Sequence, residues 1–441
     1  MIGTKLIMRH DRPVNRHLDG LDLSENPCPA IVTTGVSVLG GTYWLEESGA
    51  ARLMSNKPPY RVPLMSEIEK IEWNGFNAIS TFSGTGGSCL GYRMAGFRVL
   101  WASEFIPAAQ RCYKLNHPNS ILDTRDVRQV PPESILEAIK MQPGELDLLD
   151  GSPPCSAFST AGKREAGWGS AKKYSDSEQR VDDLFFEYIR LVDGIQPKVF
   201  VAENVSGLVK GAAKGYFKMI LAAMKECGYQ VKCAVLDAQW LGVPQMRQRT
   251  IFIGVRDDLN LQPAYPKPLP YNYTVADALP WVMKHGTAPP HSEFVANNRD
   301  VESTMVESSQ HPCPTITTGE NKGTGHAVIH DTGGQFTQNE PIADKPCPTI
   351  SVSEAPSHFL VHGEGPPETK TTRSPDGTVR RKFTIGELKR ICGFPDDFQL
   401  EGPYAKQWER LGRAVPPVMM KAIAETVRDR ILIPCKKAST T

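Results

Sequence analysis

The sequence predicts an α/β protein with a doubly wound domain and a smaller, loop- and β-rich domain. From about residue 76, short apolar segments that end in small or polar residues alternate with segments of helical period. This alternation is typical of parallel strands joined by helices. After about residue 257 the chain is rich in Pro, Gly, Thr and His and has few long apolar segments. Helical patterns return near the C-terminus.

Individual elements follow from these patterns. Strands are expected at residues 77–82, 98–102, 146–150, 199–202 and 250–255. Helical periods extend over residues 182–192, 215–227, 384–392 and 417–428. Parallel strands with crossover helices are the simplest interpretation, and we expect the last helix to rejoin the first domain.

The chain divides into four predicted segments. They are an N-terminal extension (1–70), the first domain (71–257), the second domain (258–380) and a C-terminal part that returns to the first domain (381–441). A Pro-Cys-Pro motif recurs at residues 27–32, 312–317 and 346–351. Each copy predicts a turn that leads into a strand, because proline fixes φ and Thr-Ile pairs favour extended structure. Chance similarity is the alternative, but we favour packing of residues 1–70 on the second domain.

The composition excludes several classes of protein. With 441 residues, 40% hydrophobic and 22% charged, the chain as a whole is neither disordered nor collagenous nor a coiled coil. No apolar run approaches the roughly 20 residues that cross a bilayer, and the N-terminus lacks a signal-peptide core, so we expect a cytoplasmic protein without membrane contact. The ten cysteines form no metal-ligand pairs, so no metal is expected. The net charge of +1 leaves nucleic-acid binding to local patches.

A glycine-rich turn follows the first predicted strand. It reads Phe82-Ser83-Gly84-Thr85-Gly86-Gly87, and such a turn lets backbone amides approach a nucleotide closely. Glycines that only pack a strand against a helix, or a dinucleotide oxidoreductase, are the alternatives. Glu104 follows the next strand, where an acid can accept hydrogen bonds from a ribose, and Phe105 can cover an adenine. Together they predict a nucleoside-containing cofactor.

Chemically reactive residues follow the later strands. Cys155 lies in a Pro-Pro-Cys turn after the strand at residues 146–150, at the strand end that faces the ligand crevice in such sheets. A buried structural thiol is the alternative. Glu203 ends the next strand, and Arg247 and Arg249 alternate just before the strand at 250–255. A nucleophilic thiol, a carboxylic acid and cationic anchors are therefore expected in one crevice.

These motifs resemble those of the DNA cytosine-5 methyltransferases of bacterial or phage type. FSGTGG, PPCSAFS, ENV, QMRQR, RKFTIGELKRICGFPDDF and GRAVPP occur in the order of the family. The resemblance covers residues 76–256 and 381–427. It implies a Rossmann-like class I methyltransferase domain with a mixed, mostly parallel sheet, and a target-recognition domain over about residues 258–380.

The resemblance also implies roles for individual residues. Cys155 would add to cytosine C6, Glu203 would bind N3 and the exocyclic amine, and Arg249 with Arg247 would hold the base carbonyl or a phosphate. S-adenosylmethionine would be the cofactor, without a metal. The residues implied in binding it are Phe82, Ser83, Gly84, Thr85, Gly86, Gly87, Glu104, Phe105, Asp126, Val127, Pro153, Leu184, Arg413, Ala414 and Val415.

Duplex DNA is the implied substrate, with the target base flipped out of the helix. Basic residues suited to phosphates are Lys163, Arg164, Lys172, Lys173 and Arg381. We expect a monomer, and a cognate restriction enzyme as a partner. The alternatives are a methyltransferase for cytosine in transfer RNA and a catalytically inactive DNA-binding module.

Two positions depart from the family pattern. Ser156 stands where the family usually has glutamine, and Arg413 where it usually has asparagine, near the methionine end of the cofactor. A cation beside a sulfonium is repelled unless an anion lies between them. Arg413 would therefore pair with an acid of its own domain, bind the methionine carboxylate or DNA, or select a cofactor with an extra carboxylate (carboxy-S-adenosylmethionine), which would give 5-carboxymethylcytosine.

Overall fold

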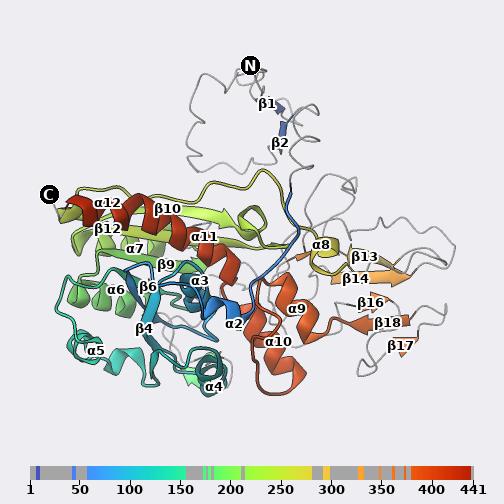
Figure 1. The fold of residues 1–441 in the computed structure, drawn as a ribbon, viewed down its shortest axis with the longest axis horizontal. Coiled ribbons are helices and arrows are strands. Elements are labelled where there is room, and N and C mark those ends of the chain that lie inside the picture. The colour runs from blue at the N-terminus through green and yellow to red at the C-terminus, as the bar shows by residue number, and fades with distance from the viewer. Residues whose placement is uncertain are drawn as a thin grey trace. The chain divides into compact units, whose positions relative to one another are not determined.

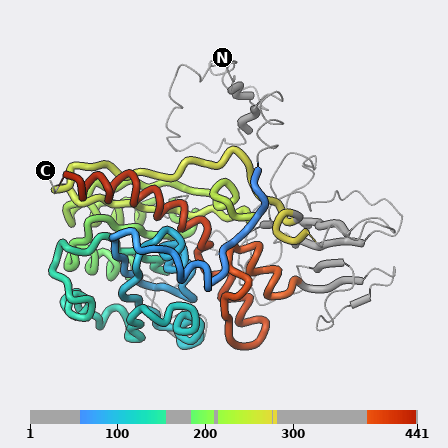
Figure 2. Tube along the Cα trace, viewed as in Figure 1, coloured from blue at the N-terminus to red at the C-terminus, as the bar shows by residue number. Residues whose placement is uncertain are grey.

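The computed structural model describes residues 57–154, 183–209, 214–280 and 383–438 in full, and elsewhere the backbone of ten short strands (Figure 1 and Figure 2). These strands are β1 (Leu6–Arg9), β2 (Thr42–Leu45), β7 (Lys172–Tyr174), β8 (Ser177–Gln179), β13 (Ser292–Asn297), β14 (His326–Asp331), β15 (Cys347–Pro348), β16 (Leu360–His362), β17 (Thr372–Arg373) and β18 (Val379–Lys382). The chain forms two compact units, Met1–Pro59 and Tyr60–Thr441. In the first unit, β1 and β2 pair antiparallel.

A seven-stranded sheet forms the centre of the second unit. Its strands are β3 (Asn77–Thr81), β4 (Arg98–Ser103), β5 (Ile121–Asp123), β6 (Leu148–Gly151), β9 (Val199–Val205), β10 (Tyr229–Asp237) and β12 (Gln248–Arg256). They lie in the order β10-β12-β9-β6-β3-β4-β5, and the pairs among β9, β6, β3, β4 and β5 are parallel. The predicted α/β class with a mixed, mostly parallel sheet is therefore confirmed.

Strand β12 departs from the simplest interpretation of parallel strands with crossover helices, because it pairs antiparallel with both β9 and β10. The short connection after β10 contains η5 (Ala238–Leu241) and β11 (Gln245–Met246). It holds no long crossover helix of the kind that parallel neighbours require. The chain therefore turns back and places β12 between β9 and β10. Strands β5 and β10 were also not predicted, since β5 has three residues and β10 is a half-exposed edge strand.

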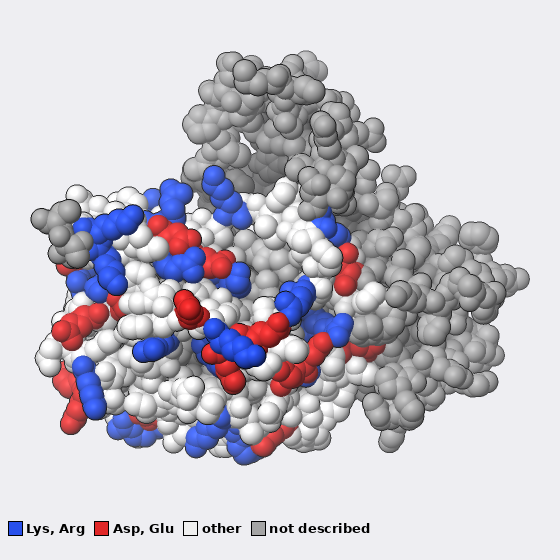
Figure 3. Space-filling view, viewed as in Figure 1, with Lys and Arg blue, Asp and Glu red and all other residues white. Residues whose placement is uncertain are grey.

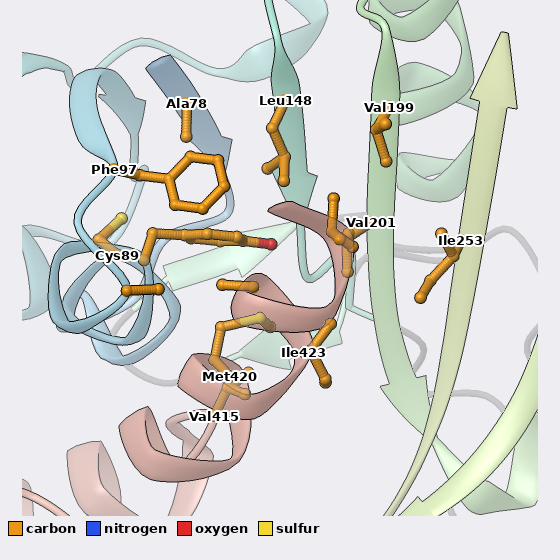
Figure 4. Packing of buried hydrophobic residues seen from close by; sticks show 14 of the residues in the cluster. Ala78, Cys89, Phe97, Leu148, Val199, Val201, Ile253, Val415, Met420 and Ile423 are labelled. Atoms are coloured by element: carbon orange, nitrogen blue, oxygen red, sulfur yellow. The ribbon is translucent and has the colours of Figure 1, made fainter. Parts of the chain in front are cut away.

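Helices cover both faces of this sheet. One face packs on α3 (Gly87–Met94), α11 (Pro417–Val427) and Tyr113 of α4 (Pro107–Asn116). Figure 4 shows Leu148, Val199 and Val201 pointing from the strands toward Met420 and Ile423 of α11. The other face packs on α5 (Pro132–Ile139), α6 (Leu184–Ile195) and α7 (Lys214–Glu226). Each face thus has its own apolar core.

A third core joins segments that are far apart in the sequence. It contains residues of α2 (Met65–Ile68), α8 (Val275–Ala278), α9 (Ile385–Ile391) and α10 (Tyr404–Arg413) together with Leu90 and Met94 of α3. Helix α9 begins at a capping box, in which Thr384 Oγ1 accepts from Glu387 N and Glu387 Oε2 accepts from Thr384 N. The C-terminal helices therefore contact the helices around the central sheet.

Short helical turns complete the described elements. They are η1 (Val127–Gln129), η3 (Ser206–Val209), η6 (Asp257–Leu259), the π-helical turn η8 (Arg428–Leu432) and the final helix α12 (Ile433–Ala438).

The predicted second domain contains a five-stranded sheet in the order β13-β14-β16-β18-β17. The third Pro-Cys-Pro copy forms β15, which pairs parallel with β11 directly before Arg247. The copies at residues 27–32 and 312–317 lie outside the described residues. Packing of residues 1–70 on this domain and the predicted boundaries at 70, 257 and 380 stay predictions.

Candidate active site

Three neighbouring parallel strands end at one edge of the sheet, and each leads into a predicted site segment. The glycine-rich loop follows β3, the Pro-Pro-Cys turn follows β6, and Glu203 lies near the end of β9. The register pairs Ser80 with Asp150 and Gly151 with Ala202, so these strands end side by side. The fold therefore brings the predicted cofactor loop and the predicted acid to one edge, where doubly wound sheets bind ligands.

The loop after β3 has an unusual backbone. Phe82 has φ 54°, Gly84 φ 58° and Gly86 φ 90°. A left-handed conformation costs a non-glycine residue about 1–3 kcal/mol and is concentrated at functional sites. The loop is held by Ser83 N, which donates to Ser103 O at 2.9 Å, and by Gly86 N, which donates to Ser83 O at 2.8 Å.

The three glycines of this loop have different neighbours. A Cβ on Gly86 would lie 2.1 Å from His117 Nε2, and a Cβ on Gly87 would lie 2.3 Å from Val415 O. Packing within the protein therefore requires glycine at these two positions. This agrees with the alternative interpretation, in which glycines of the motif only pack a strand against a helix. A Cβ on Gly84 would meet nothing within 4 Å. Gly84 alone faces open space that a ligand can fill.

Thr85 supplies a second sign of a ligand. Its side chain is 2% exposed, and among the described residues its Oγ1 has no hydrogen-bond partner. A buried hydroxyl without a partner costs about 1–3 kcal/mol, which a polar ligand can offset. The open face of Gly84 and this hydroxyl fit the amino-acid part of S-adenosylmethionine.

Glu104 and Phe105 follow β4, as predicted. Glu104 is buried, and its carboxylate accepts from Gly84 N at 2.8 Å and from Ile106 N at 2.6 Å. Burial raises the pKa of Glu104, while these N–H groups oppose the shift. Phe105 leaves 39% of its surface exposed. A buried acid tied to the glycine loop and an exposed ring beside it fit a ribose and an adenine.

Asp126 and Val127 lie at the start of η1. Asp126 accepts from Arg128 N at 3.0 Å and from Arg128 Nη1 at 2.9 Å. The guanidinium of Arg128 also donates to Asp183 at 2.7 Å, just before α6. The Val127 side chain is buried in the core, so only its backbone can contact an adenine edge.

The predicted nucleophile Cys155 lies outside the described residues, as do Ser156, Lys163 and Arg164. Pro153 is described, and its carbonyl accepts from Asn204 Nδ2 at 3.0 Å. This bond ties the start of the Pro-Pro-Cys turn to the residue after Glu203. Leu184, the first residue of α6, is buried in the core.

The remaining DNA-binding candidates lie on short strands. Lys172 and Lys173 belong to β7, and Arg381 belongs to β18. The structure describes only the backbone of these three residues.

Glu203 and Arg249 form a buried ion pair. Arg249 Nε lies 2.8 Å from Glu203 Oε1, and their side chains are 13% and 11% exposed. Burial lowers the pKa of Arg249, and Glu203 opposes this shift. The two residues lie on adjacent antiparallel strands, with Glu203 opposite Ile251. The predicted acid and its cationic partner are thus brought into contact.

Arg247 has a different environment. It is 2% exposed, and its Nη1 donates to Gly412 O at 3.0 Å. Burial, with Arg249 nearby, lowers the pKa of Arg247 to about 9. Its contact is therefore with the C-terminal GRAVPP segment, and its predicted contact with a base or phosphate stays a prediction.

The GRAVPP segment packs against the glycine loop. Val415 O is the atom that leaves no room for a Cβ on Gly87, and Ala414 and Val415 pack in the apolar cores. Arg413 Nε lies 3.0 Å from Glu409 Oε1, one helical turn earlier. Lys406 and Arg410 also contact Glu409, at 3.5 and 3.4 Å. This pairing favours the first explanation for Arg413, an acid of its own domain.

A family comparison decides what this edge of the sheet belongs to. Residues 76–429 match the model of the C-5 cytosine-specific DNA methylases. The chain belongs to this family. It is therefore a DNA cytosine-5 methyltransferase, and methyltransferases of this family use S-adenosylmethionine.

Individual relatives agree. The chain is 29% identical to the Type II methyltransferase M.NgoPII of Neisseria gonorrhoeae over 377 residues, which are 82% of this chain and 98% of the relative. It is 29% identical to M1.HphI of Haemophilus parahaemolyticus over 357 residues, 79% of this chain and 86% of that one. A solved structure of a candidate DNA modification methyltransferase encoded within an E. coli prophage has a TM-score of 0.53 at 20% identity. It covers 81% of this chain and 100% of its own, and it shows the same fold.

None of the helices among the described residues is long and apolar enough to span a membrane. No group of three or more His, Cys, Asp or Glu side chains among them is arranged to hold a metal ion.

Three residues that the sequence did not single out complete the site's surroundings. Arg128 holds Asp126, Glu409 pairs with Arg413, and Asn204 holds Pro153. The i, i+4 spacing of Glu409 and Arg413 was the available signal, since such pairs meet on a helix. Asn204 belongs to the ENV motif, but its contact with Pro153 and that of Arg128 with Asp183 join segments about 50 residues apart and could not be predicted from local sequence.

Proposed function

We propose that the enzyme transfers a methyl group to C5 of a flipped cytosine in duplex DNA through a covalent adduct with Cys155. The observation that carries the proposal is the buried Glu203–Arg249 pair at the sheet edge that also holds the glycine loop. A carboxyl group and a planar cationic donor fork are complementary to the polar edge of cytosine.

The reaction assigns one role to each residue. The Cys155 thiolate adds to C6, and Glu203, which takes up a proton when cytosine is bound, passes it to the ring nitrogen N3, which makes C5 an electron-rich enamine carbon. C5 then takes the methyl group. Transfer of the C5 proton to water, return of the N3 proton to Glu203 and expulsion of the thiolate then restore the aromatic ring and free Cys155. Arg249 keeps Glu203 in place and binds the base carbonyl.

S-adenosylmethionine supplies an electrophilic methyl group when it is bound. Gly84 and Thr85 would hold its amino-acid part, Glu104 the ribose, and Phe105 with Asp126 the adenine. No metal is needed for these steps.

A carboxylated cofactor is the second candidate, and it depends on Arg413. Arg413 lies two residues before Val415, whose carbonyl packs on the glycine loop. Because Glu409 already compensates its charge, we favour S-adenosylmethionine and 5-methylcytosine as the product. A competition assay with equal amounts of both cofactors tests this choice, and a predominance of 5-carboxymethylcytosine would reverse it.

The substrate and partners are also proposals. We propose that residues 258–380, which lie between the family's motifs, form a target-recognition domain, and this favours duplex DNA over transfer RNA. The relatives are Type II methyltransferases by name, so we propose a cognate restriction enzyme as partner. We further propose a monomer in the cytoplasm of a bacterial or phage-infected cell, which sedimentation at working concentration can test.

A covalent trap tests the mechanism. 5-Fluorocytosine carries fluorine in place of hydrogen at C5. After methyl transfer no proton can leave C5, so the covalent adduct with Cys155 persists on duplex DNA that contains this base. We expect a DNA-bound band with the wild-type protein and none with Cys155→Ala, whereas transfer RNA with the same base gives no band. A band on RNA alone would establish the RNA alternative, and no band on either would favour the inactive module.

A further inference from the structure

A buried carboxyl group lies beneath the site and has no part in the reaction described above. Asp150 is 1% exposed and lies near the end of β6, five residues before Cys155. Both of its carboxyl oxygens contact hydroxyl groups. Ser80 Oγ lies 2.8 Å from Oδ2, and Tyr92 OH lies 3.1 Å from Oδ1.

These contacts join Asp150 to the cofactor loop. Ser80 lies on β3 in register with Asp150, and its Oγ accepts from Ser83 Oγ of the loop at 3.1 Å. Tyr92 belongs to α3, the helix that the loop begins. The backbone carbonyl of Asp150 also accepts from Thr81 Oγ1 at 3.2 Å. Asp150 thus connects the end of β3, the glycine-rich loop and α3.

Asp150 also faces the proposed acid. Asp150 is in register with Val201, and Glu203 lies two residues further along β9, so both carboxyl side chains point to the same face of the sheet. Val201 on this face packs in the core with α11, as Figure 4 shows. Glu203 is paired with Arg249, and an ionised Asp150 would add a further buried negative charge to this face, which disfavours its ionisation.

We propose that Asp150 is a positioning residue which, as a neutral carboxylic acid, joins the cofactor loop to the end of β6 and to the neighbouring strand end that carries Glu203. This inference rests on the proposed function of that site. Ionisation of Asp150 would introduce a second buried negative charge beside Glu203 and weaken binding at the loop.

The surroundings agree with a neutral group. Burial raises the pKa of Asp150 from 3.8 to about 7, Glu203 adds to the shift, and the hydroxyl groups of Ser80, Tyr92 and Ser88 oppose it. The other titratable neighbours are Cys89 of α3 and Tyr188 of α6, whose own pKa values are raised by burial and by Asp150.

Binding of S-adenosylhomocysteine over pH 5.5–8.5 tests the proposal without turnover. In the wild type we expect the dissociation constant to rise above about pH 7, by up to about tenfold per pH unit. Asp150→Asn keeps the size of the side chain without a charge, so its affinity should remain high and independent of pH. Tyr92→Phe removes a group that lowers the pKa of Asp150, so its transition should move to higher pH.

Asp147→Asn is the matched control. Asp147 is a buried acid just before the same strand, but it pairs with Lys198 at the opposite end of the sheet. Its variant should keep the wild-type transition near pH 7. The proposal would be overturned if the dissociation constant of Asp150→Asn showed the same pH transition as that of the wild type. It would also be overturned if the wild type showed no such transition.

Unfolding by urea separates this proposal from the proposed function, because it needs no cofactor. A raised pKa in the folded state means that the stability contributed by protonated Asp150 is lost as pH rises from about 4 to about 7. Asp150→Asn should therefore gain stability over the wild type through this interval and no further above it. A constant difference would refute the neutral carboxyl, even for a protein that failed to bind the cofactor. If the stability difference between Asp150→Asn and the wild type is constant but the wild-type protein still methylates DNA, the proposal for Asp150 fails and the proposed function holds.

Discussion

The three glycines of the loop after β3 differ in their surroundings, and this difference shows which of them can be needed for packing and which can face a ligand. Gly86 and Gly87 have no room for a side chain because His117 and Val415 fill the space, whereas Gly84 faces open space. The motif alone cannot distinguish these cases, since all three positions read as glycine. Only the placement of distant residues identifies Gly84 as the glycine of this loop with open space beside it.

Gly84→Ala tests this distinction. We expect S-adenosylhomocysteine to bind at least about tenfold more weakly, equivalent to about 1.4 kcal/mol, because the methyl group enters the ligand's space. Isothermal titration calorimetry measures the loss. Gly228→Ala is the control, because Gly228 also has a positive φ and open surroundings but lies before β10. Equal affinity of both variants would remove Gly84 from the cofactor site.

The pair of Glu409 and Arg413 leads to a second prediction. In Glu409→Gln the charge of Arg413 is no longer compensated, so the cationic S-adenosylmethionine should bind severalfold more weakly. The neutral S-adenosylhomocysteine should be much less affected. Dissociation constants of both ligands, measured at low salt, give the ratio. In the double variant with Arg413→Asn the ratio should return toward the wild-type value, and an unchanged ratio in Glu409→Gln would place Arg413 away from the sulfonium.

The residues with local motifs were the ones that the sequence could identify. Glu104 and Glu203 follow the strands that the apolar pattern predicted, and the structure places both at the expected edge. Arg247 shows the limit of this reasoning. Its alternation with Arg249 predicted two guanidinium groups on one face, and the structure shows that the guanidinium of Arg247 binds Gly412 O, 165 residues away in the chain. Its contact with a base carbonyl or a phosphate stays a prediction.

At the scale of elements, the length of a connection explains why the predicted direction of β12 was wrong. Strands β3, β4, β6 and β9, which are joined through helices, were predicted and are parallel. Strand β12 was expected to continue this pattern, but the short link after β10 forces it to run in reverse. Pattern alone locates a strand, whereas its direction depends on the connection that precedes it.

Arg128 joins two elements, η1 and α6, and gives a prediction at this scale. In Arg128→Met the carboxylate of Asp126 loses its charged partner and its link to Asp183. We expect S-adenosylhomocysteine to bind roughly tenfold more weakly, since a charge-assisted hydrogen bond contributes about 1.5–3 kcal/mol and these groups are partly exposed. Arg125→Met, which removes only the exposed pair with Asp123, should bind as the wild type does. Equal losses in both variants would argue against a role for Arg128.

At the scale of the whole molecule, distant parts of the chain meet around the site. The glycine loop, the Glu203–Arg249 pair and the GRAVPP segment are contributed by residues more than 300 positions apart. Lys and Arg are interspersed with Asp and Glu over the face of the described residues in Figure 3, as the net charge of +1 suggests. We therefore propose that specificity for cytosine depends on the site itself and that DNA affinity depends on local basic segments.

Nucleoside mass spectrometry of duplex DNA incubated with the protein and deuteromethyl-labelled S-adenosylmethionine tests the central claim most directly. The account predicts labelled 5-methylcytosine with the wild-type protein and none with Cys155→Ala that still binds S-adenosylhomocysteine. Labelled 5-methylcytosine from the Cys155→Ala variant, or its absence with a wild type that binds the cofactor and DNA, would contradict the account.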